Sequence, residues 1–144
     1  IMLAEGEFLE HAEVYGNFYG TSKGVIAHAL NTGHDTLLEL DWQGAAQVKQ
    51  HFPQSESIFI LPPSFNALRT RLTGRGQDSD EVIERRLAAA AHDVAHADAF
   101  DYIIVNDDFD HALQDLVAIT RSIRLETARQ LHRHPALFEE FKRI

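Results

Sequence analysis

The sequence predicts an α/β protein in which helices cover a parallel sheet. Three strand-like runs, residues 36–41, 57–61 and 101–106, alternate with segments of helical periodicity, as in parallel sheets with helical crossovers. The run 57–61 is apolar after its first residue, which is typical of a strand covered on both faces. Because ligands of such sheets bind beyond the carboxyl ends of the strands, polar residues that follow these runs are the first candidates for chemistry.

The N-terminal part of the chain is expected to hold a strand and a helix. Residues 8–14 predict a short strand, and the glycine-punctuated segment 16–20 follows it. Ser22 is a candidate cap for a helix that ends before Gly33. Four apolar residues lie on one face of this helix: Val25, Ile26, Ala29 and Leu30.

Two shorter helices are expected in the middle of the chain. After the strand 36–41, one helix begins at Gln43 and ends before Pro53, because proline cannot continue a helix. The next covers residues 64–73, and the segment Gly74-Arg75-Gly76 breaks it.

Two long helices are expected in the C-terminal half. One begins around residues 78–80 and runs to about Ala97; Asp78 and Glu81 have the spacing of a capping box at its start. After the strand 101–106, Asp110 is expected to cap a last long helix, which ends before Pro135.

Composition excludes several classes of function. A chain of 144 residues with 44% hydrophobic content can form one domain with a real core. It contains no cysteine, so disulfides and thiolate metal sites are excluded. A net charge of −9 argues against nucleic-acid binding. With no membrane-length apolar run and no signal-peptide pattern, a cytoplasmic protein without membrane contact is expected, and oligomerisation is left open.

Positive charge is concentrated locally. The chain has ten arginines and three lysines, and five of the arginines lie between Arg69 and Arg86. Arg71 and Arg75 are four residues apart and share a helix face, and glycines flank Arg75. Arginine suits bidentate phosphate binding. The pattern is therefore that of a phosphate-covering lid or of a plain surface helical hairpin.

Three acidic residues follow predicted strands. Asp41 ends an apolar strand, as does the acidic element that helps to hold Mg²⁺ in phosphate-loop enzymes, although many α/β strands end this way. Asp107 and Asp108 follow the run 101–106. For these two, a chemical role and helix capping are equally balanced.

Two apparent motifs are rejected. The segment Gly16–Lys23 has three residues between its glycines, and Lys23 follows Thr21 and Ser22, so it does not match the phosphate loop. His92 and His96 have the spacing of two zinc ligands on a helix. The Asp93 side chain is too short, however, to take the role of the catalytic Glu of zinc proteases, and no third ligand is evident. No metal site is expected there.

Six segments together resemble guanylate kinase of the bacterial type, in that family's order and spacing. They are Phe8-Leu9-Glu10-His11-Ala12, Gly16-Asn17-Phe18-Tyr19-Gly20-Thr21-Ser22, Asp41-Trp42-Gln43-Gly44, Ile58-Phe59-Ile60-Leu61-Pro62-Pro63, Arg71-Leu72-Thr73-Gly74-Arg75-Gly76 and Val105-Asn106-Asp107-Asp108. The resemblance runs from about Phe8 to near the C-terminus. It implies a three-layer fold like that of P-loop nucleoside monophosphate kinases, and Mg²⁺-dependent phosphoryl transfer from ATP to GMP.

The resemblance also implies roles for individual residues. Glu10 corresponds to the carboxylate that reads the guanine edge, Thr21 to a hydroxyl that contacts guanine, and Tyr19 to a tyrosine that binds the GMP phosphate. Glu39 stands where the family usually has an aspartate implicated in guanine recognition, and Phe18 replaces a tyrosine.

On the ATP side, the resemblance implies that Asp41 lies near the ATP phosphates and Mg²⁺, and that Asn106 contacts adenine. Arg71, Arg75 and Arg86 correspond to arginines that grip the phosphates.

The family's phosphate loop, first strand and first helix are expected upstream of Ile1. Residues 1–144 alone are therefore expected to be inactive and the parent protein active. Residues 1–22 would finish the GMP-binding subdomain, 66–86 would form the lid, and 23–65 and 87–144 the core. Two alternatives remain: a non-catalytic guanylate-kinase-like module that binds phosphorylated proteins, and a kinase for another monophosphate such as AMP, which Glu10 disfavours.

Overall fold

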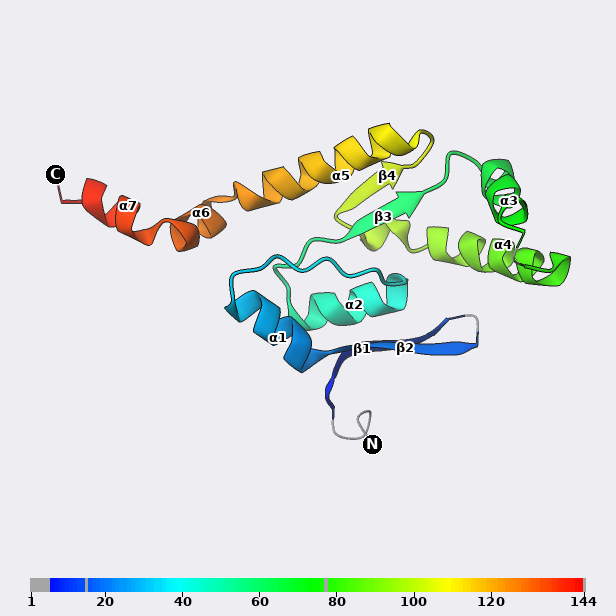
Figure 1. Ribbon diagram of the computed structural model, residues 1–144, viewed down its shortest axis with the longest axis horizontal. Coiled ribbons are helices and arrows are strands. Elements are labelled where there is room, and N and C mark those ends of the chain that lie inside the picture. The colour runs from blue at the N-terminus through cyan, green and yellow to red at the C-terminus, as the bar shows by residue number, and fades with distance from the viewer. Residues whose placement is uncertain (1–5, 15, 77, 144) are drawn as a thin grey trace. The chain divides into compact units, whose positions relative to one another are not determined.

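The computed structural model describes residues 6–14, 16–76 and 78–143 (Figure 1). Its contacts divide the chain into two compact units, one comprising Ile1–Phe59 with Ser64–Ile103 and the other Ile60–Pro63 with Ile104–Ile144. In chain order the elements are β1 Phe8–Val14, β2 Asn17–Ser22, α1 Lys23–Asn31, α2 Trp42–His51, β3 Ile58–Leu61, α3 Phe65–Gly74, α4 Asp80–Val94, the 3₁₀ helix η1 Ala97–Ala99, β4 Tyr102–Val105, α5 Phe109–Arg124, α6 Thr127–Arg133 and α7 Pro135–Phe141.

The first unit begins with an antiparallel hairpin of β1 and β2. Strand β1 has the predicted bounds, whereas β2 was not predicted. Val14 pairs with Asn17, and Gly16 in the connection has φ = 78°, a left-handed conformation that favours glycine. The residues of β2 are mostly exposed, so this strand lacks the apolar alternation by which strands are predicted.

An irregularity in register shapes β1. Phe8 pairs with Ser22 and Glu10 with Thr21, so Leu9 is an extra residue on β1. In a regular strand successive side chains point to opposite faces. Here Leu9 and Glu10 are both 3% exposed. A bulge can redirect a side chain in this way, and it brings the Glu10 carboxylate to a buried position.

Helix α1 confirms the predicted helix after Ser22. Ser22 occupies the N-cap position but makes no side-chain capping bond, and Gly33, with φ = 79°, lies beyond the helix end as expected. Of the predicted apolar face, only Ile26 is buried, while Val25 and Leu30 are exposed.

The prediction of a buried strand at 36–41 is wrong. These residues belong to no helix or strand, and Leu37 is 81% exposed. A strand requires a neighbour for its backbone N–H and C=O groups, and among the described residues none pairs with this segment. Its apolar pattern indicates side chains that suit burial but does not identify a pairing partner.

Helix α2 confirms the predicted short helix and packs beside the hairpin (Figure 1). The Gln47 side chain makes two bonds to the backbone of one residue of β1: it accepts from the His11 N–H at 3.1 Å and donates to the His11 carbonyl at 2.9 Å. Gln47 therefore binds the edge of β1 as a neighbouring strand would.

Strands β3 and β4 form a parallel pair and confirm two of the three strands predicted for the parallel sheet. The Tyr102 N–H donates to the Ser57 carbonyl at 3.0 Å, and the Asn106 N–H donates to the Leu61 carbonyl at 2.7 Å. Ile104 is buried, but Ile60, Ile103 and Val105 are more than half exposed. The expectation that β3 is covered on both faces is therefore wrong within the described part of the chain.

The start of this strand pair is joined to α2 by Asp101. Its Oδ2 accepts from the Ser57 N–H at 2.8 Å, from the Ser57 hydroxyl at 2.7 Å and from Lys49 Nζ at 2.9 Å. The Lys49 ammonium also donates to the Ser55 carbonyl at 2.6 Å. One carboxylate thereby connects the residues that precede both strands to the last turn of α2.

Helices α3 and α4 pack against each other around Leu72, Ile83 and Leu87, with Leu68 at the edge. Helix α3 confirms the helix predicted over residues 64–73, and Ser64 is its N-cap, since its hydroxyl accepts from the Ala67 N–H at 3.0 Å. The capping box predicted for α4 is wrong: Ser79 is its N-cap residue. Asp78 lies one residue before this N-cap, and its carboxylate instead pairs with the guanidinium of Arg86 at 3.1 Å.

The single helix predicted between β4 and Pro135 is divided into α5 and α6, and α7 begins at Pro135. Asp108, not Asp110, caps α5, because its Oδ1 accepts from the His111 N–H at 2.9 Å. Helix α5 ends at Arg124, where Gln130 Nε2 of α6 donates to the Arg124 carbonyl at 2.6 Å. This bond satisfies a carbonyl group at the end of α5. The helix therefore ends without the glycine or proline that usually marks a helix C-terminus in a sequence, which is why its end was not predicted. Among the described residues, no helix is long and apolar enough to span a bilayer.

Candidate functional site

The buried carboxylate of Glu10 is the centre of the candidate site. It is 3% exposed and is the one charged side chain in the buried class among the described residues. Thr21, its cross-strand partner, donates from Oγ1 to Glu10 Oε1 at 2.6 Å. Burial of a carboxylate is costly unless hydrogen bonds compensate it. The hairpin provides one such bond and fixes the orientation of the carboxylate.

The other oxygen of Glu10 lies against the start of α2. A Cβ atom added to Gly44 would be 3.0 Å from Glu10 Oε2 and 3.4 Å from Asp41 Oδ1. Asp41 is the N-cap of α2, since Oδ1 accepts from the Gly44 N–H at 2.8 Å and Oδ2 accepts from Gln43 Nε2 at 3.1 Å. Two predicted site carboxylates, from separate elements, therefore meet at one glycine.

The hairpin places Tyr19, which was predicted to bind the GMP phosphate, on the same face as Glu10. Glu10 pairs with Thr21 and Ala12 with Tyr19 in a regular register, so Tyr19, Thr21 and Glu10 share one face. Tyr19 is 59% exposed, which leaves its hydroxyl accessible to a ligand. Phe18 lies on the opposite face.

Glu39 is not brought into this cluster by any strand. It is exposed and belongs to the segment between α1 and α2 that has no regular structure.

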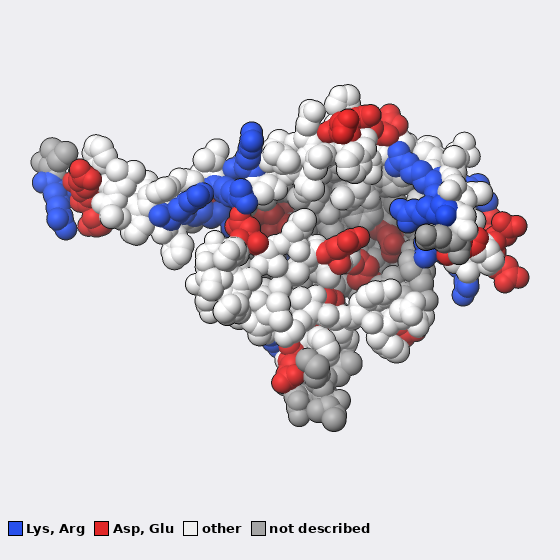
Figure 2. All heavy atoms as spheres, viewed as in Figure 1, with Lys and Arg blue, Asp and Glu red and all other residues white. Residues whose placement is uncertain are grey.

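The predicted phosphate-binding arginines lie on the α3–α4 pair. Arg71 is exposed on α3, and Arg75 is exposed as the C-cap residue of that helix. Arg86 is half-buried on α4, and its guanidinium pairs with Asp78. In Figure 2 basic side chains gather over α3 and α4, with acidic side chains beside them.

One arginine of this cluster is used for packing rather than for a ligand. Arg69 on α3 forms a forked pair with Glu84 on α4, donating from both terminal nitrogens. Glu84 raises the pKa of Arg69 through this hydrogen bond and its charge. Arg69 thus joins the two helices of the pair.

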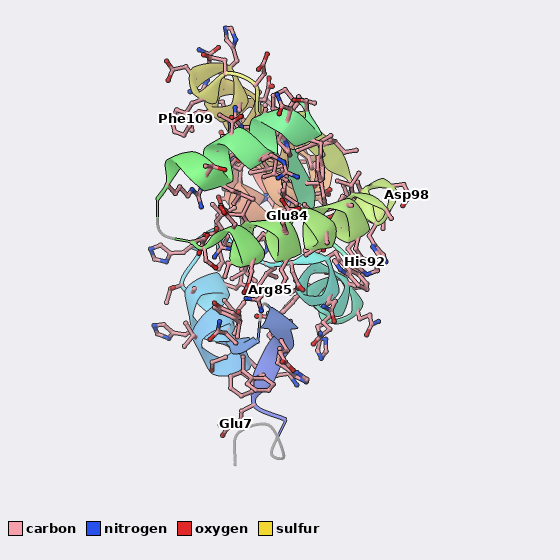
Figure 3. All side chains as sticks on the ribbon, turned by 90° about the vertical axis from the view of Figure 1, so that its right-hand side faces the viewer. Glu7, Glu84, Arg85, His92, Asp98 and Phe109 are labelled. Carbon is pink, nitrogen blue, oxygen red and sulfur yellow. The ribbon has the colours of Figure 1, made fainter. Side chains whose placement is uncertain are left out.

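The two histidines of the rejected zinc motif pack against a tryptophan. Trp42 stacks on His96 with ring centroids 3.8 Å apart and planes 10° apart, and His92 meets Trp42 edge-on at 5.8 Å. Figure 3 shows Glu84 and His92 along α4, with α3 beside the first and α2 beside the second. His92 of α4 and His96, which precedes η1, thereby contact the first residue of α2.

Asp93, between the two histidines, is coupled to the candidate site. Its burial raises the pKa of this carboxyl, and the negative charge of Asp41 raises it further, while His92 and His96 lower it. The negative charges of Asp93, on α4, and Asp41, at the start of α2, therefore repel each other. Among the described residues, no group of three or more His, Cys, Asp or Glu side chains could hold a metal ion.

Helix α2 and the 3₁₀ helix η1 with its flanking residues border a cavity of about 400 Å³. It is lined by Trp42, Ala45, Ala46, Lys49, Gln50, Ser57, His96, Ala99 and Phe100. It contains neither Glu10 nor Asp41, and its walls are largely apolar.

In the second unit, Asn106 directly follows β4 and Asp108 caps α5. Of the two roles that the sequence allowed for Asp108, a chemical role or helix capping, the structure shows helix capping. Asp107 is exposed.

Sequence reasoning did not assign a role to Gly44 or Gln47. Gly44 was part of the segment that carried the resemblance, but its close approach to Glu10 depends on the packing of α2 on β1. Gln47 carried no signal of its own.

Comparisons with known proteins agree with this arrangement. The family model described as guanylate kinase matches residues 2–123. A guanylate kinase of Thiobacillus denitrificans is 82% identical over 143 residues, which cover 99% of this chain and 68% of that protein. One from Pseudomonas savastanoi is 52% identical over 139 residues, covering 96% of this chain and 65% of the relative.

Among solved structures, the crystal structure of guanylate kinase from Anaplasma phagocytophilum is similar, with a TM-score of 0.78 at 35% identity. The match covers 97% of this chain and 68% of that one. The chain thus spans about two thirds of the length of the proteins it matches. The fold is α/β, of the nucleoside monophosphate kinase type. The chain belongs to the guanylate kinase family.

Proposed function

We propose that the protein carrying this chain transfers a phosphoryl group from ATP to GMP, giving ADP and GDP, as an enzyme of purine nucleotide metabolism in the cytoplasm. The observation that carries the proposal is the buried Glu10 carboxylate, bonded to Thr21 on one oxygen and set against α2 on the other, in a chain of this family.

Glu10 is suited to reading guanine. The guanine edge has two adjacent donors, N1–H and the 2-amino group, and an ionised carboxylate offers about four acceptor positions. Thr21 uses one position on Oε1 and its hydroxyl can accept in turn. Tyr19, on the same face, would bind the GMP phosphate. Glu39 would approach guanine from the segment before α2, with a side chain one methylene longer than aspartate.

The charged groups at α2 and on the α3–α4 pair would serve the phosphates. Arg71 and Arg75 are exposed and offer planar donor forks that suit phosphate oxygens. Arg86 would act beside Asp78, which already orients its guanidinium. In phosphoryl transfer such groups act by positioning and by stabilising charge. Asn106 would contact adenine.

Mg²⁺ fits the start of α2. The cation prefers oxygen ligands and usually takes only one or two carboxylates, with water and substrate phosphates completing its shell. The Asp41 carboxylate accepts only two local bonds, so it has further lone pairs for a cation, and the negative charge of Asp93 acts at the same place. Asp41 would hold the metal directly or through water. When bound, the cation would neutralise developing charge on the phosphates.

A phosphoprotein-binding module is the less supported reading. A non-catalytic module does not need residues that bind ATP. This chain nevertheless has all four residues proposed for the phosphates and adenine of ATP: Arg71, Arg75, Arg86 and Asn106. The relatives named above bear the name of a kinase.

The test is a coupled assay of the protein that carries this chain, with Mg²⁺-ATP as donor and GMP or AMP as acceptor. We expect turnover with GMP and at least about 100-fold lower kcat/KM with AMP, because a site built to bond specific donors rejects a base that lacks them. Glu10→Gln should lower kcat/KM for GMP about 100-fold by a loss of acceptor charge and pairing.

The matched control is Glu13→Gln, an exposed position on the same strand. It should leave the rate unchanged. Equal use of AMP and GMP, or a Glu10→Gln variant as active as the parent, would contradict the proposal.

A further inference from the structure

We infer that Gly44 is a positioning residue for nucleobase selection: its missing side chain makes the space that fixes the Glu10 carboxylate, and thereby sets the preference for a purine with a 2-amino group. The inference rests on the proposed guanine-reading function of Glu10.

The space at Gly44 is smaller than a methyl group needs. A Cβ there would lie 3.0 Å from Glu10 Oε2, 3.3 Å from Leu40 Cβ and 3.4 Å from Asp41 Oδ1. Carbon atoms in good contact are about 3.5–4.0 Å apart. The closest contact is with the carboxylate itself, so an added methyl group would press first on the group that is proposed to read the base.

The helix cannot readily move away to relieve this contact. Gln47 lies one turn beyond Gly44 on the same face of α2, and it holds both backbone polar groups of His11, the residue next to Glu10. Retreat of α2 from β1 would break both bonds.

The carboxylate cannot readily rotate away either. Oε1 is held by the Thr21 hydroxyl at 2.6 Å, and the irregular register of β1 keeps the side chain buried. Asp41, which would also meet a methyl group at Gly44, is fixed by its capping bond to the Gly44 N–H. The remaining response to a methyl group is a displacement of Glu10 by a few tenths of an ångström or more.

Such a displacement would act unequally on related purines. Guanine presents two parallel N–H donors to one carboxylate, which requires both oxygens in register. Hypoxanthine has the N1–H donor but no 2-amino group, so it depends on one of the two bonds. Moving the carboxylate should therefore harm GMP more than IMP, and the ratio of their kcat/KM values should fall.

The experiment compares Gly44→Ala with Gly24→Ala in the protein that carries this chain. Gly24 is also a helical glycine, but a Cβ there meets only Ser22 Oγ at 3.8 Å, an ordinary contact. With Mg²⁺-ATP as donor, Gly44→Ala should raise KM for GMP about 10-fold, because small misplacements at a binding site have effects of this order. KM for ATP should stay within about twofold and the GMP-to-IMP preference should fall about 10-fold on the same ground. Gly24→Ala should change none of these values.

Unchanged KM and preference in a folded Gly44→Ala variant would overturn the inference, as would equal losses for GMP, IMP and ATP.

A second measurement decides the case in which Gly44→Ala folds poorly. If the contact with Glu10 is the cause, Gly44→Ala should lower the urea midpoint in the parent protein much more than in a Glu10→Ala background, where the carboxylate is gone. Equal losses in both backgrounds would refute a Glu10–Gly44 contact. This unfolding cycle does not depend on catalysis. Absence of GMP turnover in the parent would therefore refute the proposed function and the base-selection role, while the cycle would still decide the contact.

Discussion

Replacing Asp101 by alanine should destabilise the first unit by about 3–4 kcal/mol at neutral pH. The carboxylate accepts two hydrogen bonds from Ser57, at 2.8 and 2.7 Å, and one from Lys49 at 2.9 Å. Bonds to a charged group contribute about 1.5–3 kcal/mol each when well protected. The Lys49 and Asp101 side chains are 41% and 33% exposed, so their ion pair should contribute only about 0.2–1 kcal/mol. The same exposure places the two Ser57 bonds at the lower end of their range.

The loss should depend on pH with a defined sign. Burial raises the pKa of the Asp101 carboxyl, but the hydrogen bonds from Ser57 and Lys49 outweigh it, so the pKa lies below its ordinary value. A carboxyl whose pKa is lowered in the folded state stabilises the fold above the unfolded pKa, about 3.9 for aspartate. That contribution is lost as pH falls through the lower folded value. The difference between Asp101→Ala and the parent should therefore shrink below about pH 4.

The assay is urea unfolding of both proteins at pH 7, 5 and 3, with Asp98→Ala as control. Asp98 is an exposed aspartate three residues earlier, and its loss should change stability by no more than about 0.5 kcal/mol. The reasoning fails if Asp101→Ala matches the control at pH 7, or if its deficit at pH 3 equals that at pH 7.

Two further variants test other parts of the first unit. Asp93→Asn should stabilise the protein at pH 7 by up to about 1 kcal/mol, because burial and the charge of Asp41 raise the pKa of Asp93. A carboxyl whose pKa is raised in the folded state favours the fold while it is protonated, below its unfolded pKa. This contribution to stability is lost as pH rises through the folded pKa, so the ionised carboxylate is unfavourable at pH 7. Urea midpoints at pH 7 and 3 should show the gain only at pH 7, and a loss at pH 7 would count against it. Leu87→Ala should cost about 2–5 kcal/mol in urea unfolding, since Leu87 is 1% exposed in the α3–α4 core. A cost below about 1 kcal/mol would mean that this core does not support the pair.

Local signals predicted the positions of α1, α2 and α3, because the causes of these helices are local. Asp41 and Ser64 precede helices that they cap through their own side chains. The choice between Asp108 and Asp110 was not local: both are short acids near the start of α5, and the backbone conformation at Asp108 decides which one reaches a free N–H.

Strand prediction failed where pairing decided the outcome. Residues 36–41 have the pattern of a buried strand but no described neighbour, whereas the polar β2 forms because β1 lies beside it. Backbone pairing depends on residues distant in sequence, and the pattern of one segment cannot specify them.

The candidate site was only partly accessible to sequence reasoning. Glu10, Thr21 and Asp41 were singled out by resemblance, and the structure places Glu10 and Thr21 in contact and Asp41 at the same glycine. That Glu10 is buried follows from an extra residue in β1, and that Gly44 must lack a side chain follows from the packing of α2. Both are properties of three-dimensional contact.

The bonds between Gln47 and His11 have a consequence for self-association. An exposed strand edge presents unpaired N–H and C=O groups, to which a strand of another molecule can add. At His11 both groups of β1 are occupied by a single side-chain amide. An incoming strand would have to displace Gln47 before it could extend the hairpin, so one glutamine gives this short sheet local protection against edge-to-edge aggregation.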